Sequence, residues 1–539
     1  MARTVTLDDL PDSALQADVV IAGTGPAGAT LARALSGGRL RVLLLESGGE
    51  ARDAAADALN EVENIGRPRI ADQWLVRNRI LGGTSHTWSG RCAPFDAIDF
   101  EPRGWVAESG WPIEPAGLVP YLQRATGYLG TVPGAGPATQ DFWTRAQVRA
   151  ALPEFDPEAL GPQLWSFSRD RRSRGEHTRF GWHLPGDLGA NVTLVTHASL
   201  CDIELNDATD ALRAVQAVGA NGQRRRVPAA ALVLCCGAIE NARLLLNADR
   251  QLPNGIGNRH DQVGRYLMDH LRGATAQFSL RGSQALQRRL GHYRLPGDHV
   301  FALGMHLSPS RQRAEGLLNC AAWLEGRISQ DDPWNALKRV AKGNIRALPD
   351  LLRNAGMLPL GLTERVLARR GLPRKLDRLE LICMCEQMPD PDSRVRLAER
   401  RDAHGLRRAQ IDWRVHAQEV QTLRRMTELV GAEFKRLGWV APQPEPWITQ
   451  DAALPPHFLD VAHPTGTTRM GRDPHRSVVD ETGQVHGVRG LYVAGSSVFP
   501  TSSHANPTLM IVALALRLAE HLAGQRLETV ERATETAAV

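Results

Sequence analysis

The sequence has no apolar run long enough to cross a lipid bilayer. Its most apolar stretch, residues 507–516, is shorter than the ~20 apolar residues that a membrane-spanning helix needs. This argues against an integral membrane protein. The first 19 residues hold four aspartates and no apolar core of the kind that a secretory signal carries, so we expect a protein of the reducing cytoplasm.

Cysteine and lysine are scarce. None of the seven scattered cysteines belongs to the paired CxxC-like spacing of a zinc site, so we expect no metal. Cys235 and Cys236 adjoin a strand-like run, which favours a buried reduced pair. The net charge of +5 is small for 539 residues and calls for no nucleic-acid partner. The chain has only four lysines: Lys338, Lys342, Lys375 and Lys435.

Composition is otherwise ordinary. Hydrophobic residues make up 42% and charged residues 23% of the chain, which excludes disordered and collagen-like classes. At ~100–200 residues per domain, the length allows more than one domain.

The N-terminal region predicts a dinucleotide-binding unit. An apolar strand at 17–22 leads into Gly23, Gly25 and Gly28, then a helix at 27–35 and a second strand at 40–45 that ends at Glu46. These glycines permit a tight turn, approach of the backbone to a pyrophosphate, and close packing of helix on strand. The acid suits a ribose diol and disfavours NADP. This motif alone does not separate FAD from NAD.

Similar elements recur in the middle and at the end of the chain. We predict strands at 191–205, 229–236 and 490–495, with a hairpin turn at Asn221-Gly222 and helices at 238–248 and 506–523. One discontinuous nucleotide-binding domain, interrupted by a second domain, explains this distribution better than two consecutive domains.

The segment 329–376 has a different character. It is predicted to form short helices broken by glycine and proline, with ten basic residues against four acidic ones. It fits a lid, an oligomerisation arm, a basic membrane-surface patch, or a solvated face, which is the usual meaning of a charge run.

Four segments indicate that the expected dinucleotide is a flavin, FAD. Residues 79–89, 231–246, 463–471 and 495–508 resemble, in this order, the flavin loop, the second strand–turn–helix, the active-site histidine segment and the closing segment of the glucose–methanol–choline (GMC) oxidoreductases. The matches run from residue 18 to about residue 523. Residues 263–270 and 386–394 resemble most closely the branch of pyranose oxidases and sugar or sugar-acid dehydrogenases.

The resemblance implies an α/β fold with a discontinuous Rossmann-like FAD-binding domain (residues 1–100, 187–272 and 456–530) and an α+β substrate-binding domain with an antiparallel sheet (residues 101–186 and 273–455). It implies oxidation of an alcohol to a carbonyl, with O2 or another acceptor reoxidising the flavin. The residues expected to hold FAD are Gly23, Gly25, Gly28, Glu46, Gly82, Gly83, Thr84, Ser85, Ser89, Leu200, Gly237, Gly495, Ser496, Pro507 and Thr508.

By the same resemblance, His463 is the base that takes the hydroxyl proton, and Asn506 is the second polar partner of the substrate oxygen. Imidazole suits this role because its pKa near ~6.5 leaves much of it neutral at working pH. His504 either lines the pocket or is a bystander, and His270 is expected to order structure. Pro507 is expected to begin a helix whose N-terminus faces the flavin N1–C2 edge.

One position departs from the family. The histidine that carries a covalent flavin in some members is replaced by Thr87, and a histidine lies one place earlier, at His86. We therefore predict non-covalent FAD, with His86 bonded to backbone and Ser89 near flavin N5. A GMC-type lyase that keeps FAD as a non-redox cofactor is the main alternative. An NAD-dependent dehydrogenase and a flavin monooxygenase are the remaining ones.

Overall fold

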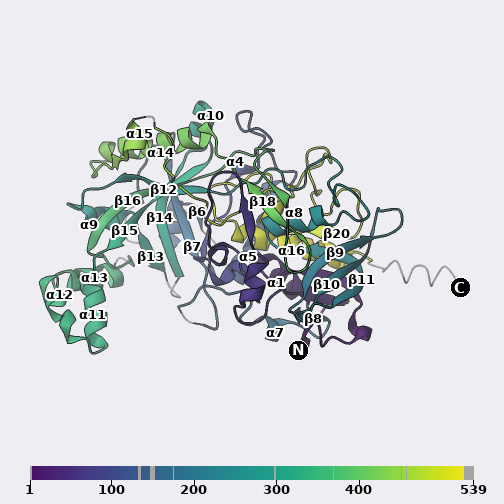
Figure 1. Ribbon diagram of the computed structural model, residues 1–539. Coiled ribbons are helices and arrows are strands. Elements are labelled where there is room, and N and C mark those ends of the chain that lie inside the picture. The colour runs from purple at the N-terminus through teal and green to yellow at the C-terminus, as the bar shows by residue number, and fades with distance from the viewer. Residues whose placement is uncertain are drawn as a thin grey trace.

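The computed structural model describes residues 3–131, 135–145, 152–173, 175–295, 299–367, 369–450, 452–456 and 458–526. Within them the chain forms two large sheets that lie side by side, with helices around them (Figure 1). A small third sheet joins β17 (Arg394–Arg401), β18 (Arg407–Asp412) and β4 (Val62–Asn64).

The first sheet has the order β1-β8-β3-β2-β11-β10-β9, and β20 also pairs with β11. All pairs are parallel except the two antiparallel pairs that β10 makes. The strands are β1 (Arg3–Thr6), β2 (Ala17–Ala22), β3 (Val42–Leu45), β8 (Val192–Thr196), β9 (Ser199–Leu205), β10 (Leu212–Val218), β11 (Arg224–Leu234) and β20 (Leu491–Val493).

Strands from the start, the middle and the end of the chain pair within this one sheet. Leu232 of β11 pairs with Val20 of β2 on one side and with Leu491 of β20 on the other. The predicted strand at 191–205 is wrong in one respect: it is two strands, because His197 between them takes a left-handed φ of 50°. β11 starts five residues earlier than predicted, since its first half forms the hairpin with β10.

Three helices follow these parallel strands: α1 (Pro26–Leu35), α8 (Ala238–Asn247) and α16 (Thr508–Gly524). α16 packs between α1 and α5 (Pro115–Leu129) and buries an almost continuous apolar surface. It begins at Thr508, two residues later than predicted, with Pro507 as the residue that caps it. Asn506 therefore lies outside the helix, in the turn before it.

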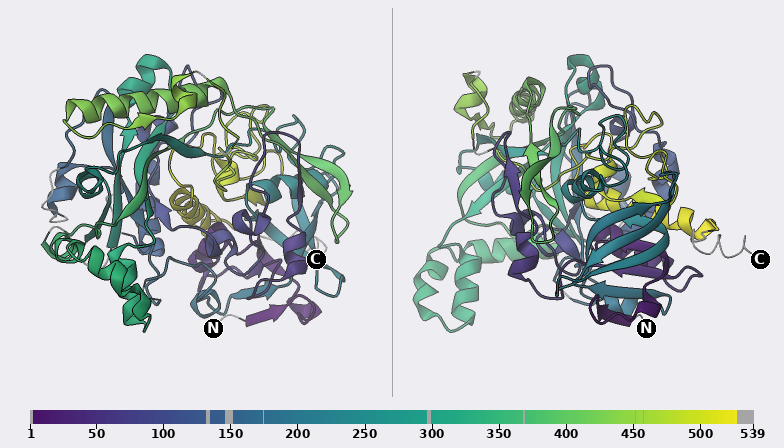
Figure 2. Two further views of the ribbon diagram at one scale, coloured as in Figure 1. Left: turned by 60° about the vertical axis from the view of Figure 1, so that its left-hand side comes forward. Right: turned by 45° about the vertical axis from the view of Figure 1, so that its right-hand side comes forward.

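The second sheet is antiparallel, as expected for the substrate-binding domain, with the order β19-β12-β16-β15-β14-β7-β5. Helix α14 (Ala417–Arg436) packs along it (Figure 2, left). The strands are β5 (Arg91–Cys92), β7 (Leu160–Phe167), β12 (Leu271–Gln277), β14 (His299–Leu307), β15 (Cys320–Ile328), β16 (Leu376–Cys385) and β19 (Gln443–Pro444), with β6 (Gly136–Pro137) and β13 (His292–Leu295) paired at the side.

Two strand pairs cross the predicted domain boundaries. β5 comes from the segment assigned to the FAD domain yet pairs with β7, and the β17–β18 hairpin comes from the substrate segment yet pairs with β4. The boundaries themselves stay predictions. The remaining helices are α2 (Ala54–Ala58), α3 (Gln73–Val76), α4 (Ala97–Phe100), α6 (Gln140–Arg145), α7 (Leu184–Asp187), α9 (Ser283–Arg289), α10 (Pro309–Glu315) and α15 (Pro446–Thr449).

The 329–376 segment folds into the predicted short helices: α11 (Pro333–Ala341), α12 (Leu348–Arg353) and α13 (Met357–Leu367). They project from the edge of the antiparallel sheet (Figure 1, lower left). Ile345 and Val366 are 77% and 73% exposed there. In the described parts of the chain, no helix combines the length and the apolar character that crossing a bilayer requires.

Candidate active site

A cavity of about 710 Å³ receives side chains from both large sheets. Most residues predicted from the sequence line it, although they come from widely separated stretches of the chain. These are Gly23, Gly25, Glu46, Gly83, Thr84, Ser85, Ser89, Leu200, Gly237, His463, Gly495, Ser496, Asn506, Pro507 and Thr508. Gly28, Gly82 and His504 are not among the lining residues.

The N-termini of α1, α8 and α16 all meet this cavity, which Ala27, Ala238 and Thr508 line. No side chain caps any of these three helices. The first N–H groups of a helix lack partners within the helix and carry a partial positive charge. Three such ends at one cavity make a binding place for anionic groups such as a pyrophosphate.

The glycines shape the cavity in two different ways. A Cβ built on Gly25, Gly237 or Gly495 would meet no atom within 4 Å, because it would project into open space. At Gly28 the Cβ would lie 1.8 Å from the carbonyl oxygen of Gly23. Gly25, Gly237 and Gly495 therefore leave room for a ligand, whereas Gly28 allows α1 to pack on the turn that precedes it.

Glu46 ends β3 at the cavity wall and is 4% exposed. Its carboxylate accepts hydrogen bonds from the backbone N–H and the hydroxyl of Thr24 and from Gly48 N at 3.1 Å. Burial raises the pKa of this carboxyl, which these bonds oppose. Arg79 also lines the cavity and donates to Ser47 Oγ at 3.0 Å. The sequence analysis missed Thr24 and Arg79.

Side chains of the loop at 82–89 bond mainly to backbone groups. His86 Nε2 lies 2.8 Å from Leu81 O, as predicted for a loop histidine. Ser85 Oγ donates to Gly82 O at 2.7 Å and accepts from Phe180 N at 3.0 Å. Thr87 donates to Asn78 Oδ1 at 2.9 Å. Ser89 is exposed to the cavity.

His463 is held between two polar side chains. Asn506 Nδ2 lies 3.2 Å from His463 Nε2, and His270 Nδ1 lies 2.8 Å from His463 Nδ1. His270 Nε2 in turn lies 2.7 Å from Ser503 O and 3.1 Å from Ser502 O. The two histidines are thus linked in one hydrogen-bonded chain that ends on backbone carbonyls.

This chain assigns the tautomers. Carbonyl oxygens only accept, so His270 must carry its hydrogen on Nε2, and its Nδ1 is then an acceptor in the neutral ring. His463 consequently donates from Nδ1, which leaves the lone pair of His463 on Nε2, toward Asn506. Burial, reinforced by the neighbouring His270, lowers the pKa of His463 to about 3, and burial lowers the pKa of His270. Both rings are therefore neutral.

Asp269 anchors the backbone of this pair. Its buried carboxylate accepts from His463 N at 3.1 Å and from His270 N at 2.8 Å. Arg69 Nη2 lies 3.1 Å from the same carboxylate and 3.0 Å from Asp460. The sequence analysis had assigned no role to Arg69 or Asp269.

His504 is fully buried, and its Nε2 lies 3.1 Å from Asp96 Oδ2. Burial acts to lower the pKa of His504, but the Asp96 carboxylate outweighs it and the pKa is raised. His504 is not among the residues that line the cavity, and its role stays a prediction. In the described residues, no group of three or more His, Cys, Asp and Glu side chains is arranged to hold a metal ion.

Comparisons with known proteins show which proteins the chain is similar to. A family model described as GMC oxidoreductase matches residues 389–515. The chain is 27% identical to 6'''-hydroxyparomomycin C oxidase of Streptomyces lividus (94% of this chain, 92% of the relative) and 26% identical to paromamine 6'-oxidase of Streptomyces fradiae (94% and 91%). The solved structure of pyridoxine 4-oxidase from Mesorbium loti has the same fold, with a TM-score of 0.58 and 20% identity over 94% of this chain and 99% of that one.

Proposed function

The chain belongs to the GMC oxidoreductase family, and on this basis we propose that it is an FAD-dependent enzyme that oxidises a CH–OH group to a carbonyl. The substrate is a sugar, a glycoside or another hydroxylated natural product. One observation carries the proposal: the lone pair of His463 Nε2 faces Asn506 in a cavity that also receives three uncapped helix N-termini.

The cavity offers hydrogen-bond donors and a free volume that suit FAD. The N–H groups of α1 suit the pyrophosphate, and Glu46 suits the ribose diol. The N-terminus of α16, beside Asn506, would stabilise negative charge on the reduced ring. When bound, FAD supplies the acceptor for the hydride of the substrate carbon. His86 is already bonded to Leu81 O and Thr87 has no imidazole, which supports non-covalent attachment.

His463 acts as the base. Its Nε2 takes the hydroxyl proton, while its Nδ1–H stays bonded to His270. Asn506 Nδ2, 3.2 Å from the same nitrogen, has a second N–H that donates to the substrate oxygen and orients it. Burial lowers the pKa of His463 and so keeps the imidazole neutral until the substrate arrives.

The test is anaerobic reduction of the purified yellow protein by a panel of sugars, glycosides and simple alcohols. A substrate should bleach the flavin absorbance, and subsequent oxygen uptake separates an oxidase from a dehydrogenase. Product formed without bleaching would support the lyase alternative. Dependence on added NAD(P)H would support a nicotinamide-dependent dehydrogenase or a monooxygenase.

The variant His463→Ala should retain FAD but reduce it at least ~100-fold more slowly. His475→Ala, at an exposed histidine outside the cavity, serves as the matched control and should behave as the parent does. Full activity in His463→Ala would overturn the assignment of the base.

A further inference from the structure

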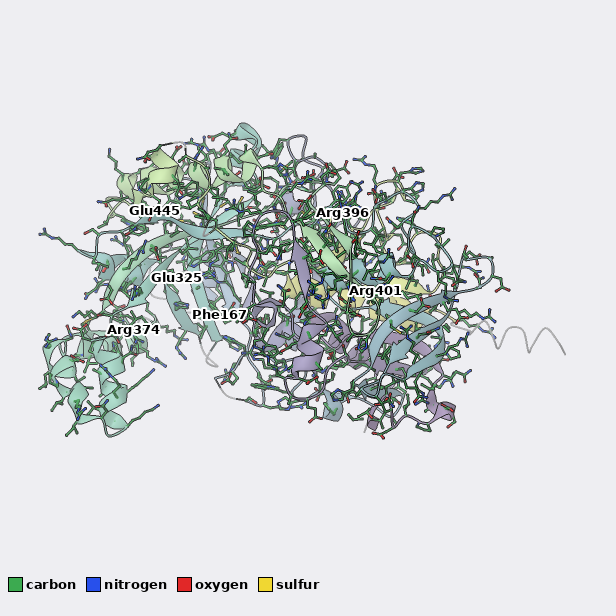
Figure 3. All side chains as sticks on the ribbon, in the orientation of Figure 1. Phe167, Glu325, Arg374, Arg396, Arg401 and Glu445 are labelled. Atoms are coloured by element: carbon green, nitrogen blue, oxygen red, sulfur yellow. The ribbon has the colours of Figure 1, made fainter. Side chains whose placement is uncertain are left out.

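Two arginines from the antiparallel sheet line the cavity, Arg91 and Arg272. Arg91 opens β5 two residues after Ser89 and pairs with Phe167 of β7. Arg91 is half-buried, and it lines the cavity together with Phe167 and Trp323. Figure 3 labels Phe167 and Glu325, which lie on strands of the same antiparallel sheet.

Aromatic rings hold the Arg91 side chain in place. Its guanidinium carbon lies 4.1 Å from the ring centroid of Trp323 and 4.6 Å from that of Trp165. The two indoles contact each other edge to face, with centroids 5.5 Å apart. These contacts stabilise a cation through the ring faces but occupy none of its five N–H donors.

Arg91 forms no ion pair and no hydrogen bond with the residues that the structure describes. The carboxylate on the same wall is already engaged: Glu325 lies 2.6 Å from Arg272 Nη2 and 3.3 Å from Trp323 Nε1. Arg272 is therefore paired with Glu325, whereas Arg91 has no carboxylate within ion-pair distance among the described residues and is attracted by Glu325 only at longer range.

Such a charge is unfavourable in an enclosed place unless something pairs with it. Burial, together with the nearby Arg272, lowers the pKa of Arg91 to about 9. His292 adds no charge to this wall, because burial and Arg91 lower its pKa and keep the imidazole neutral. Every group on this wall thus leaves the Arg91 donors available to a ligand that carries negative charge.

We propose that Arg91 binds an anionic group of the substrate, so that the preferred alcohol carries a carboxylate or a phosphate. The inference rests on the proposed function, since it names the substrate class of the same site. A planar guanidinium held between aromatic rings matches either oxyanion with two parallel hydrogen bonds. A cationic amino sugar would be repelled by the same charge.

The first experiment compares ligands that differ only in charge. Perturbation of the flavin spectrum of the holoenzyme reports the Kd of D-glucuronate, of its near-isosteric neutral amide D-glucuronamide, of D-glucose 6-phosphate and of D-glucosamine. We expect at least ~10-fold tighter binding of glucuronate or of the phosphate than of the amide, equivalent to one charge-assisted contact, and the weakest binding for glucosamine. Comparison of the Kd of glucuronate with the Kd of glucose 6-phosphate distinguishes a carboxylate site from a phosphate site.

Variants then assign the preference to Arg91. Arg91→Gln should bring the ratio of anion to amide affinity close to one, and Arg91→Lys should retain part of it. Glu325→Gln frees Arg272 and should strengthen anion binding. Arg171→Gln, which removes an exposed positive charge outside the cavity, should leave the ratio unchanged. FAD content and thermal midpoint verify that each variant is folded.

Equal affinity for glucuronate and its amide, failure to bind either anion, or an unchanged ratio in Arg91→Gln would overturn the inference. These outcomes are distinct from failure of the proposed function. If no alcohol bleaches the flavin, the oxidation is wrong, yet the binding ratio still reports on Arg91. If neutral alcohols bleach the flavin and the anions do not bind, the proposed function stands and only the assignment of Arg91 is wrong.

Discussion

The proposed base, His463, needs its lone pair on Nε2, and His270 is the residue that sets this tautomer. The carbonyls of Ser502 and Ser503 determine which nitrogen of His270 carries hydrogen, and His270 passes that choice on to His463. The imidazole is therefore correctly oriented before any substrate binds, which removes a reorientation step from the proton transfer. His270 is in this sense a positioning residue.

Replacing His270 tests this arrangement. His270→Leu should slow flavin reduction by ~10-fold or more with FAD still bound, and His270→Gln should recover part of the rate because its amide oxygen accepts from His463 Nδ1–H. His475→Leu is the control at an exposed site. The neutral base is lost as pH falls through its pKa of about 3, so the parent rate should be flat above about pH 5.

His270 is among the groups that lower the pKa of His463. In His270→Leu the loss of rate at low pH should therefore begin at a higher pH than in the parent. A purely structural defect would lower the rate at all pH values alike and would not respond to glutamine.

At the scale of elements, the cavity follows from the parallel sheet. β2 leads into α1 and β11 leads into α8, and β20 runs parallel beside them before the turn that precedes α16. Parallel strands end at one edge of the sheet, so the helices that follow them begin at that edge. Three helix N-termini meet there, although almost 500 residues separate α1 from α16.

Two glycines of the first turn should respond differently to the same added methyl group. Gly25→Ala places its Cβ in open cavity with φ of −62°, a value that alanine adopts. The apoprotein should keep its stability while the Kd for FAD rises at least ~10-fold. Gly28→Ala forces Cβ against the backbone oxygen of Gly23 and should destabilise the protein by about 3 kcal/mol.

Urea unfolding of the apoproteins and fluorescence titration with FAD separate these effects. Equal losses of stability in the two variants would contradict the division between a glycine that makes room for the ligand and one that allows the helix to pack.

For the molecule as a whole, a buried ion pair joins distant parts of the chain. Arg103 and Glu386, at the end of β16, form two bonds of 2.7 Å, and both side chains are fully buried. Glu386 also accepts from Asn319 N at 3.1 Å. Neither member of the pair lines the cavity, so the pair concerns stability and not the chemistry of the site.

Arg103→Met leaves Glu386 charged and unpaired in the interior, and should lower the free energy of unfolding by about 3–5 kcal/mol. The double variant Arg103→Met/Glu386→Gln removes the stranded charge and should recover a large part of that loss. Chemical denaturation of the holoproteins at neutral pH measures both. A loss below about 1 kcal/mol in the single variant would show that the pair does not hold these segments together.

Local patterns were sufficient for much of the fold. The strand at 17–22, the glycine turn and α1 follow from short-range periodicity and from turn chemistry, which depend on neighbouring residues only. Family resemblance added His463 and Asn506, which the structure brings to 3.2 Å. Local patterns did not predict the break in the strand at His197 or the start of α16 at Thr508. One backbone angle determines the first boundary, and one proline determines the second.

The sequence by itself determined an α/β protein with a glycine turn after β2 and a histidine segment near its end. Only the tertiary structure decided what surrounds that histidine. His270 lies 193 residues from His463, and the Ser502 carbonyl that orients His270 lies 232 residues from His270 along the chain. The charge of Arg91 has meaning only because folding places Glu325 on Arg272 and two indoles around the guanidinium. Pairings between such distant residues depend on how the sheets pack, and no local pattern encodes them.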